Sequence, residues 1–205
     1  PLIVKTGETI AVFEELMTMF NINTIHAHEE TGDDWTFKRD IRVRKWCHQN
    51  NIAFIESPCN GVVRGLKNRD DWAKIRNNRV YSQIIPKPKK LKPIIIECST
   101  KIPNKDDSLF GDHIIGKVQK GGRTEALLLL QSFKNRRGKD YLLNISSPLK
   151  SEISCSRLSA HLTWGTISVK ELLGWLPKNN PKTSTSKTSL HGRNLTAFKS
   201  RIAWR

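Results

Sequence analysis

The segment richest in groups that could do chemistry runs from Cys155 to Leu172 and reads CSRLSAHLTWGTISVKEL. In it Ser156 and Ser159 flank Arg157 at the place where the pattern predicts the start of a helix. Serine hydroxyls, the unpaired N–H groups of a first helical turn and a guanidinium can together bind phosphate, with help from the helix dipole. The alternative is that either serine is an ordinary N-cap, which is the commoner use of serine at a helix start. The residues alone leave both interpretations open.

The distribution of charge favours a polyanionic partner. The chain has 35 Lys and Arg against 19 Asp and Glu, a net charge of +16 and a pI near 10.0. Residues 1–50 hold 6 basic and 8 acidic residues, so the other 155 hold 29 basic and 11 acidic residues, a net charge of +18. Nucleic acid is the first candidate partner for such an excess. A solvated basic surface without a dedicated ligand is the alternative.

Several classes of protein are disfavoured. No run reaches the length of about 18 apolar residues that a membrane span needs, and no signal peptide opens the sequence. The HExxH, Walker and GxGxxG motifs are absent, which weakens metalloprotease, nucleotide hydrolase and dehydrogenase interpretations. The four cysteines form no CxxC pair, which argues against structural zinc and favours a reducing cytoplasm: Cys47, Cys59, Cys98 and Cys155.

A metal site is not predicted at His26 and His28, although their spacing would place two imidazoles side by side. His26 and His28 alternate along a predicted strand and therefore share a face. A metal would need a third ligand, for which Glu30 is the nearest candidate. Histidines satisfied by hydrogen bonds are the simpler interpretation.

The first sixty residues alternate between helical and strand patterns. Apolar residues recur at helical spacing over residues 10–20 and Asp34–Gln49, whereas Asn23–Ala27 and Ile52–Glu56 are short apolar strands. Strands separated by helices predict βαβ crossovers and a parallel, Rossmann-like sheet.

The remainder of the chain changes character. Residues 84–122 contain prolines and a lysine cluster and predict a connection between domains, while the leucine-rich segment Arg123–Phe133 predicts a helix. A further helix is predicted from residues 156–159 through Leu173. The predicted domains are thus 1–83, α/β, and 123–205, all-helical. The chain starts without methionine and ends within an apolar helical face, so we expect it to be an internal fragment.

These motifs, in this order, resemble the cryptochrome/DNA photolyase flavoproteins. The pattern SRLSxxLxWGxIS at residues 156–168 is the most specific match. The other matching features are spread over nearly the whole chain: residues 26–32, 35–36, 39–40, 61–64, 121–122, Phe133, Tyr141, Pro148 and 198–205. The resemblance implies an N-terminal α/β domain that lacks its first strand, followed by the start of a helical FAD-binding domain.

The resemblance also implies a cofactor and its binding residues. It assigns FAD-binding roles to Tyr141 and to five consecutive residues, Cys155, Ser156, Arg157, Leu158 and Ser159. Many family members have threonine where Cys155 stands, which replaces a hydroxyl with a weaker thiol. The resemblance does not determine whether an antenna chromophore is bound or which one.

DNA is the partner that the resemblance implies, as a damaged duplex with a flipped pyrimidine dimer. Arg201, Trp204 and Arg205 are then candidates for phosphate contact and base stacking. Two positions differ from many repair enzymes, since Ile145 stands where they have arginine and Arg201 where they have a lesion-contacting glutamate. The expected function is therefore a light-driven, FAD-dependent photolyase, with a cryptochrome-like photoreceptor or a basic nucleic-acid-binding module without cofactor as alternatives.

Overall fold

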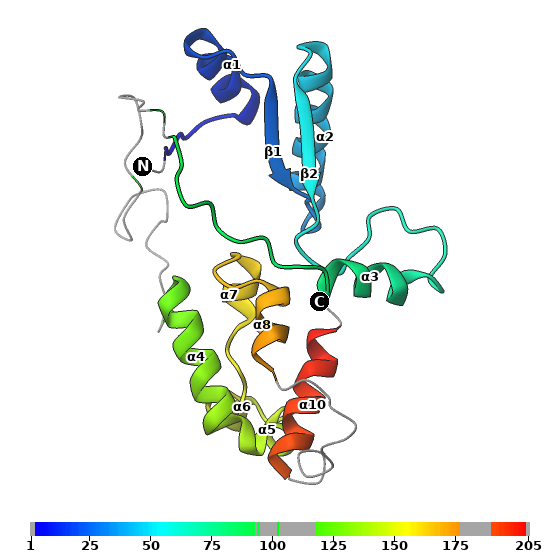
Figure 1. The fold of residues 1–205 in the computed structure, drawn as a ribbon, viewed down its shortest axis with the longest axis vertical. Helices are drawn as coiled ribbons and strands as arrows, with labels where there is room; N and C mark the ends of the chain where they lie inside the picture. The colour runs from blue at the N-terminus through cyan, green and yellow to red at the C-terminus, as the bar shows by residue number, and fades with distance from the viewer. Residues whose placement is uncertain (1–2, 93, 95–101, 103–117, 177–189, 204–205) are drawn as a thin grey trace. The chain divides into compact units, whose positions relative to one another are not determined.

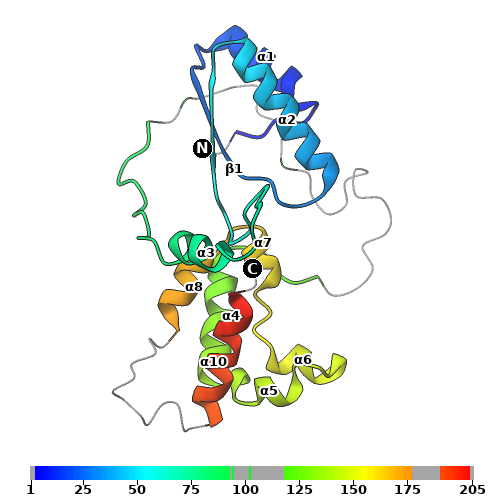
Figure 2. The same cartoon turned by 90° about the vertical axis from the view of Figure 1, so that its right-hand side faces the viewer.

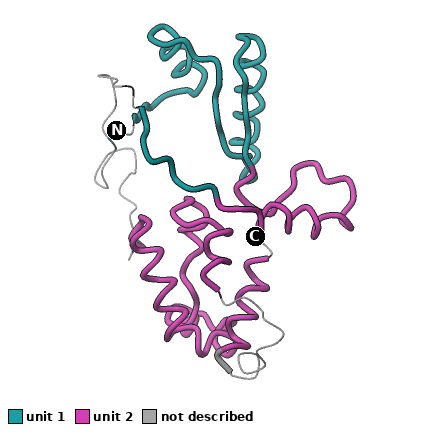
Figure 3. The backbone as a smooth tube through the Cα atoms, viewed as in Figure 1, with its two compact units in different colours: residues 1–57, 85–118 teal, residues 58–84, 119–205 magenta. Residues whose placement is uncertain are grey.

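The chain is organised as two compact units. A computed structural model describes residues 3–92, 94, 102, 118–176 and 190–203. One unit consists of residues 1–57 and 85–118, the other of residues 58–84 and 119–205 (Figure 3). The predicted boundaries at 83/84 and 122/123 do not coincide with these units, because residues 58–84 group with the helical part.

The first unit contains a two-stranded parallel sheet and two helices. In chain order its elements are α1 (Thr9–Met19), β1 (Thr24–His28), α2 (Asp34–Gln49) and β2 (Ala53–Ser57) (Figure 1). In the sheet Thr24 lies opposite Ala53 and His28 opposite Ser57. The predicted βαβ unit is confirmed, with each strand starting one residue later than expected. The wider Rossmann-like arrangement stays a prediction.

The sequence explains how α2 begins and what it buries. The carboxylate of Asp33 accepts a hydrogen bond from the Thr36 amide at 2.8 Å, and this bond lowers the pKa of Asp33. On the apolar side of α2, Trp46 stacks on Phe13 of α1 with 5.8 Å between ring centroids. Both helices lie on the same side of β1 (Figure 2). The buried core of this unit is small: Val43, Trp46, Cys47 and Ile52.

The second unit contains helices and no strand among its described residues. Its elements are α3 (Trp72–Val80), α4 (Arg123–Asn135), η2 (Arg137–Asp140), α5 (Tyr141–Asn144), α6 (Pro148–Ser154), α7 (Ser159–Thr163), α8 (Val169–Trp175) and α10 (Leu190–Ile202). The predicted leucine-rich helix is confirmed as α4. Phe133 of α4 packs against Phe198 of α10, with 4.6 Å between ring centroids. An α/β unit and an all-helical unit agree with the predicted fold class at this coarse level.

Residues 58–84 belong to the helical unit for reasons visible in their contacts. Val80 is buried in the same core as Leu130 and Ile202. The guanidinium of Arg76 donates to the carbonyl of Ala203 at 3.1 Å, which ties α3 to the end of α10. The helical periodicity of α3 is weak in sequence, so these partners, which lie far away in the chain, were not predictable from it.

The single helix predicted from residues 156–159 through Leu173 is wrong. α7 ends at Thr163 and α8 begins at Val169, and Gly165 between them has φ of +66°, a left-handed conformation that favours glycine. The turn is closed by a hydrogen bond from the Thr166 amide to the His161 carbonyl at 2.9 Å. The glycine therefore ends the helix where apolar periodicity alone suggests that it continues.

Across the described ranges, no helix is both long enough and apolar enough to cross a lipid bilayer. The Ser/Thr-rich stretch 182–189 and most of the predicted connection at 84–122 lie outside the described residues.

Candidate functional site

The serine-flanked loop joins α6 to α7 and has an unusual backbone. Figure 1 shows it as the yellow ribbon between these helices. Arg157 has φ of +62°, in the left-handed region, while Leu158 next to it is buried in the core. A non-glycine residue in this region costs about 1–2 kcal/mol, and such strain is concentrated at functional sites. Leu158 is buried whereas Arg157 beside it is exposed, so the Arg157 side chain lies at the surface.

Ordinary helix capping does not account for the two serines. The N-cap residue of α7 is Leu158, whose side chain makes no capping hydrogen bond. The Ser156 hydroxyl accepts from the Leu158 amide at 3.4 Å, within the loop itself. The N-capping interpretation of the sequence is thus not what the structure shows for Ser156. α7 is only 5 residues long, so its dipole contributes little beyond its N–H groups.

One arginine that the sequence analysis missed anchors this loop. The guanidinium of Arg137 donates to the carbonyls of Cys155 and of Ser156, the latter at 3.1 Å. It also reaches back to α4, with bonds to the Leu129 carbonyl at 2.9 Å and the Ser132 hydroxyl at 2.8 Å. A planar guanidinium can make such a set of bonds at once, which an ammonium cannot. Arg137 therefore fixes the entry to the loop against α4.

The electrostatic environment of the loop is positive. Burial lowers the pKa of the Arg137 guanidinium, and the charges of Arg136 and Arg157 lower it further. Burial raises the pKa of the Cys155 thiol, partly opposed by Arg137 and Arg157. Among the described residues, neither Arg137 nor Arg157 forms an ion pair with a carboxylate. The exposed guanidinium of Arg157 is thus the charge of this loop that an external anion can reach.

Tyr141, the other predicted cofactor residue, lies in the core at the start of α5. Its ring meets those of Phe133 and Phe198 edge to face, at 5.6 and 5.7 Å between centroids. Burial raises the pKa of its phenol, the charge of Cys155 adds to this effect and Arg201 opposes it. The structure therefore brings Tyr141, Cys155 and Arg201 within electrostatic range, although they are far apart in sequence.

A buried asparagine holds the segment that carries Tyr141. Asn194 of α10 is 1% exposed; its side-chain oxygen accepts from the Leu142 amide and its nitrogen donates to the Lys139 carbonyl, both at 2.7 Å. Asn194 was not predicted, because an asparagine in a polar helix resembles any surface residue. Its signal in the sequence is only its position one helical turn before Phe198, on the buried face.

Trp164, in the turn after α7, could in sequence be a packing residue or an electron relay; it is 83% exposed, so packing in the helical core is not its role here. His26 and His28 are both exposed on one face of β1, as the alternation predicts. Of the candidate DNA-contacting residues, Arg201 is exposed in the last turn of α10, whereas Trp204 and Arg205 lie outside the described residues.

Comparisons with known proteins show the fold of the chain. No protein-family model and no curated protein matches the sequence. A search of solved structures finds a bacterial class III photolyase from Agrobacterium tumefaciens, with a TM-score of 0.68 and 18% sequence identity. The match covers 97% of this chain and 42% of that photolyase. The chain therefore has a photolyase-like fold and spans less than half the length of that protein.

Proposed function

We propose that this chain is part of an FAD-dependent, photolyase-like flavoprotein that acts on DNA by photoinduced electron transfer. The observation that carries the proposal is the anchored, positively charged loop at Cys155–Ser159, which occurs within a photolyase-like fold. Fold alone does not specify function, so the weight of the proposal rests on this loop.

The residues of the loop fit the diphosphate of FAD. Arg157 is exposed and has no carboxylate partner among the described residues, and the first turn of α7 has no side-chain cap. Ser156 and Ser159 add hydroxyl groups on either side of Arg157 in the chain. A doubly charged diphosphate accepts hydrogen bonds from such donors, and charge-assisted bonds are about twice as strong as neutral ones.

The roles of the residues follow from their positions. Arg157, Ser156 and Ser159 would hold the diphosphate, and Arg137 positions the loop without touching the cofactor. Leu158 and Tyr141 are buried, so they contribute packing and the shape of the surroundings. FAD, when bound, supplies the light absorption and the electron transfer, while the protein supplies binding and orientation.

Cofactor binding is tested by reconstitution of the complete gene product with FAD. We expect Arg157→Gln to weaken FAD binding at least about tenfold, the loss of one charge-assisted bond. Arg193→Gln removes an exposed arginine of α10 and serves as the matched control, with unchanged affinity. Equal affinities for both variants would contradict the assignment of the loop.

The DNA part of the proposal rests on charge. The net charge of +16 favours a polyanion, and Arg201 offers an exposed guanidinium within electrostatic range of Tyr141. Light-dependent repair of an oligonucleotide that contains a pyrimidine dimer, by the complete gene product with FAD bound, is the direct test.

A photoreceptor without repair activity is the second candidate function. Ile145 is half-buried against the helical core and Arg201 carries the opposite charge to a lesion-contacting carboxylate. A preparation that binds FAD and reduces it in light but leaves the dimer intact would favour this candidate. A preparation that shows no flavin absorption even after reconstitution would instead favour a nucleic-acid-binding module without cofactor.

A further inference from the structure

A stretch of the first unit, residues 85–92, combines charge and exposure in a way that the flavin site does not use. Its sequence, IPKPKKLK, contains Lys87, Lys89, Lys90 and Lys92 and no acidic residue. The nearest carboxylates along the chain are those of Asp71 and Glu97. We call residues 85–92 the basic segment.

The basic segment is fully presented to solvent. Each of its 8 residues is exposed, including Ile85 at 85% and Leu91 at 77%. It follows α3 in Figure 1 as green ribbon without helix or strand. No hydrogen bond or ion pair joins it to another residue that the structure describes. Its four ammonium groups are therefore not neutralised by those residues.

Proline keeps the basic segment from forming a helix. Pro86 and Pro88 each fix their own φ near −65° and disfavour the helical region for the residue before them, and the segment has neither helix nor strand, with a bend at Lys89. Restricted residues lose less conformational entropy when a partner orders them. The segment therefore loses less conformational entropy than a flexible chain when it binds along a linear partner, and it does not fold into a helix.

The spacing of the lysines matches the charge density of a nucleic-acid strand. Five residue steps separate Lys87 from Lys92, so the two residues lie at most about 15–18 Å apart when a partner straightens the bend at Lys89. One strand of duplex DNA carries a phosphate about every 3.4 Å of helix axis, so about five phosphates occupy that length. Four lysines thus lie opposite about five phosphates.

We propose that the basic segment is a second, sequence-independent contact for the nucleic-acid backbone, separate from the loop at Cys155–Ser159 and from Arg201. Its lysines neutralise phosphates and release condensed counterions. It reads no base, because lysines on an extended chain contact phosphates without sequence information. This contact requires neither flavin nor a lesion.

The test is the salt dependence of binding to an undamaged duplex. Fluorescence anisotropy of a labelled duplex of about 20 base pairs, titrated with the whole chain between about 50 and 200 mM NaCl, gives the slope of log K against log salt concentration. The variant replaces the four lysines of the basic segment with glutamine. The control replaces four other exposed lysines, so that both proteins lose the same charge: Lys45, Lys120, Lys139 and Lys150.

Each phosphate contact contributes about 0.9 to the slope, so loss of two to four contacts flattens it by about 1.8–3.6. We expect this change in the segment variant, less than half of it in the control, and recovery when the four lysines are replaced by arginine. Equal slopes for the variant and the control would overturn the proposal. If poly-glutamate displaces the labelled duplex as effectively as unlabelled DNA of equal charge does, the proposal is also overturned. The partner would then be an acidic protein. The titration contains no FAD and no dimer, so its outcome is independent of the proposed photolyase-like activity.

Discussion

Replacement of Arg137 by methionine tests whether one guanidinium holds the serine-flanked loop. Methionine keeps most of the aliphatic length, so the packing of the side chain is retained while the hydrogen bonds to Leu129, Ser132, Cys155 and Ser156 are lost. The carbonyls of Cys155 and Ser156 then lose a charged donor.

The expected loss of stability follows from these four bonds. A hydrogen bond to a charged group contributes about 1.5–3 kcal/mol. Part of that gain is offset by the desolvation of the guanidinium, which is also why burial lowers its pKa. With the two loop carbonyls as the main loss, we expect Arg137→Met to reduce the free energy of unfolding by about 2–4 kcal/mol.

Urea-induced unfolding, followed by circular dichroism, measures this loss. Arg136→Met is the matched control, because Arg136 is the preceding residue, is exposed and has no side-chain partner among the described residues. Its effect should stay within about 0.5 kcal/mol. Arg137→Lys should fall between the two, because an ammonium cannot span four acceptors. If Arg137→Met unfolds at the same urea concentration as Arg136→Met, the anchoring role of Arg137 is refuted.

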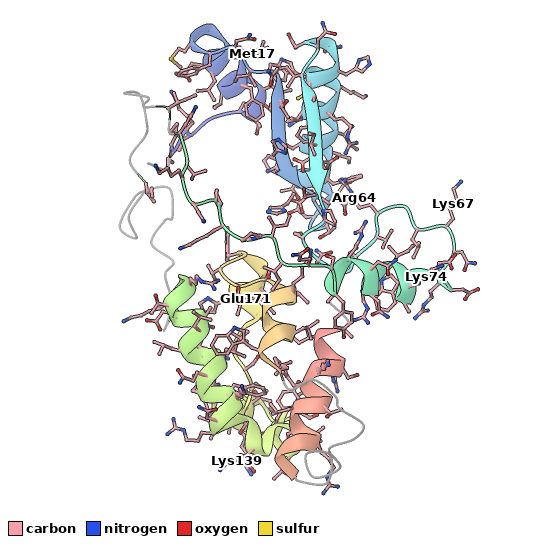
Figure 4. The ribbon with its side chains drawn as sticks, viewed as in Figure 1. Met17, Arg64, Lys67, Lys74, Lys139 and Glu171 are labelled. Atoms are coloured by element: carbon pink, nitrogen blue, oxygen red, sulfur yellow. The ribbon has the colours of Figure 1, made fainter. Side chains whose placement is uncertain are left out.

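Three further predictions concern the helical unit, and each is measured by urea-induced unfolding. Gly165→Ala should destabilise by about 1–2 kcal/mol because φ is +66°, whereas Gly174→Ala, in open space within α8, should stabilise by about 0.5–1 kcal/mol; equal effects would contradict this. Asn194→Ala removes the side-chain partner of the Leu142 amide and of the Lys139 carbonyl, and should reduce the free energy of unfolding by about 2–4 kcal/mol. An unchanged urea midpoint would refute the role of these two hydrogen bonds. The hydrogen bond from Arg123 lowers the pKa of Glu171 (labelled in Figure 4), so stability from this pair is present above pH about 4.3 and is lost as pH falls through the lowered pKa. The difference in stability between the native protein and Arg123→Gln should therefore vanish at low pH, and a constant difference would contradict the ion pair.

The sequence by itself predicted the elements whose signals are local. The extent of α2 was predicted from apolar residues at helical spacing, which is a property of neighbouring residues, and the structure adds Asp33 as its N-cap. The buried face of α10, with Leu195 and Phe198, follows from the same periodicity. The order of motifs also led to a photolyase-like fold, which the match to a solved structure supports at the coarse level.

The way in which the loop at Cys155–Ser159 is held depends on contacts between segments that are distant in the chain. The left-handed backbone of Arg157 and the hydrogen bonds from Arg137 join residues up to 19 positions apart, and no local pattern encodes them. The break at Gly165 overrode a helical pattern, because one residue with positive φ ends a helix regardless of the apolar spacing around it. Local signals fix where helices and strands form, whereas the hydrogen-bond partners of a buried polar group depend on which distant segments the core brings together.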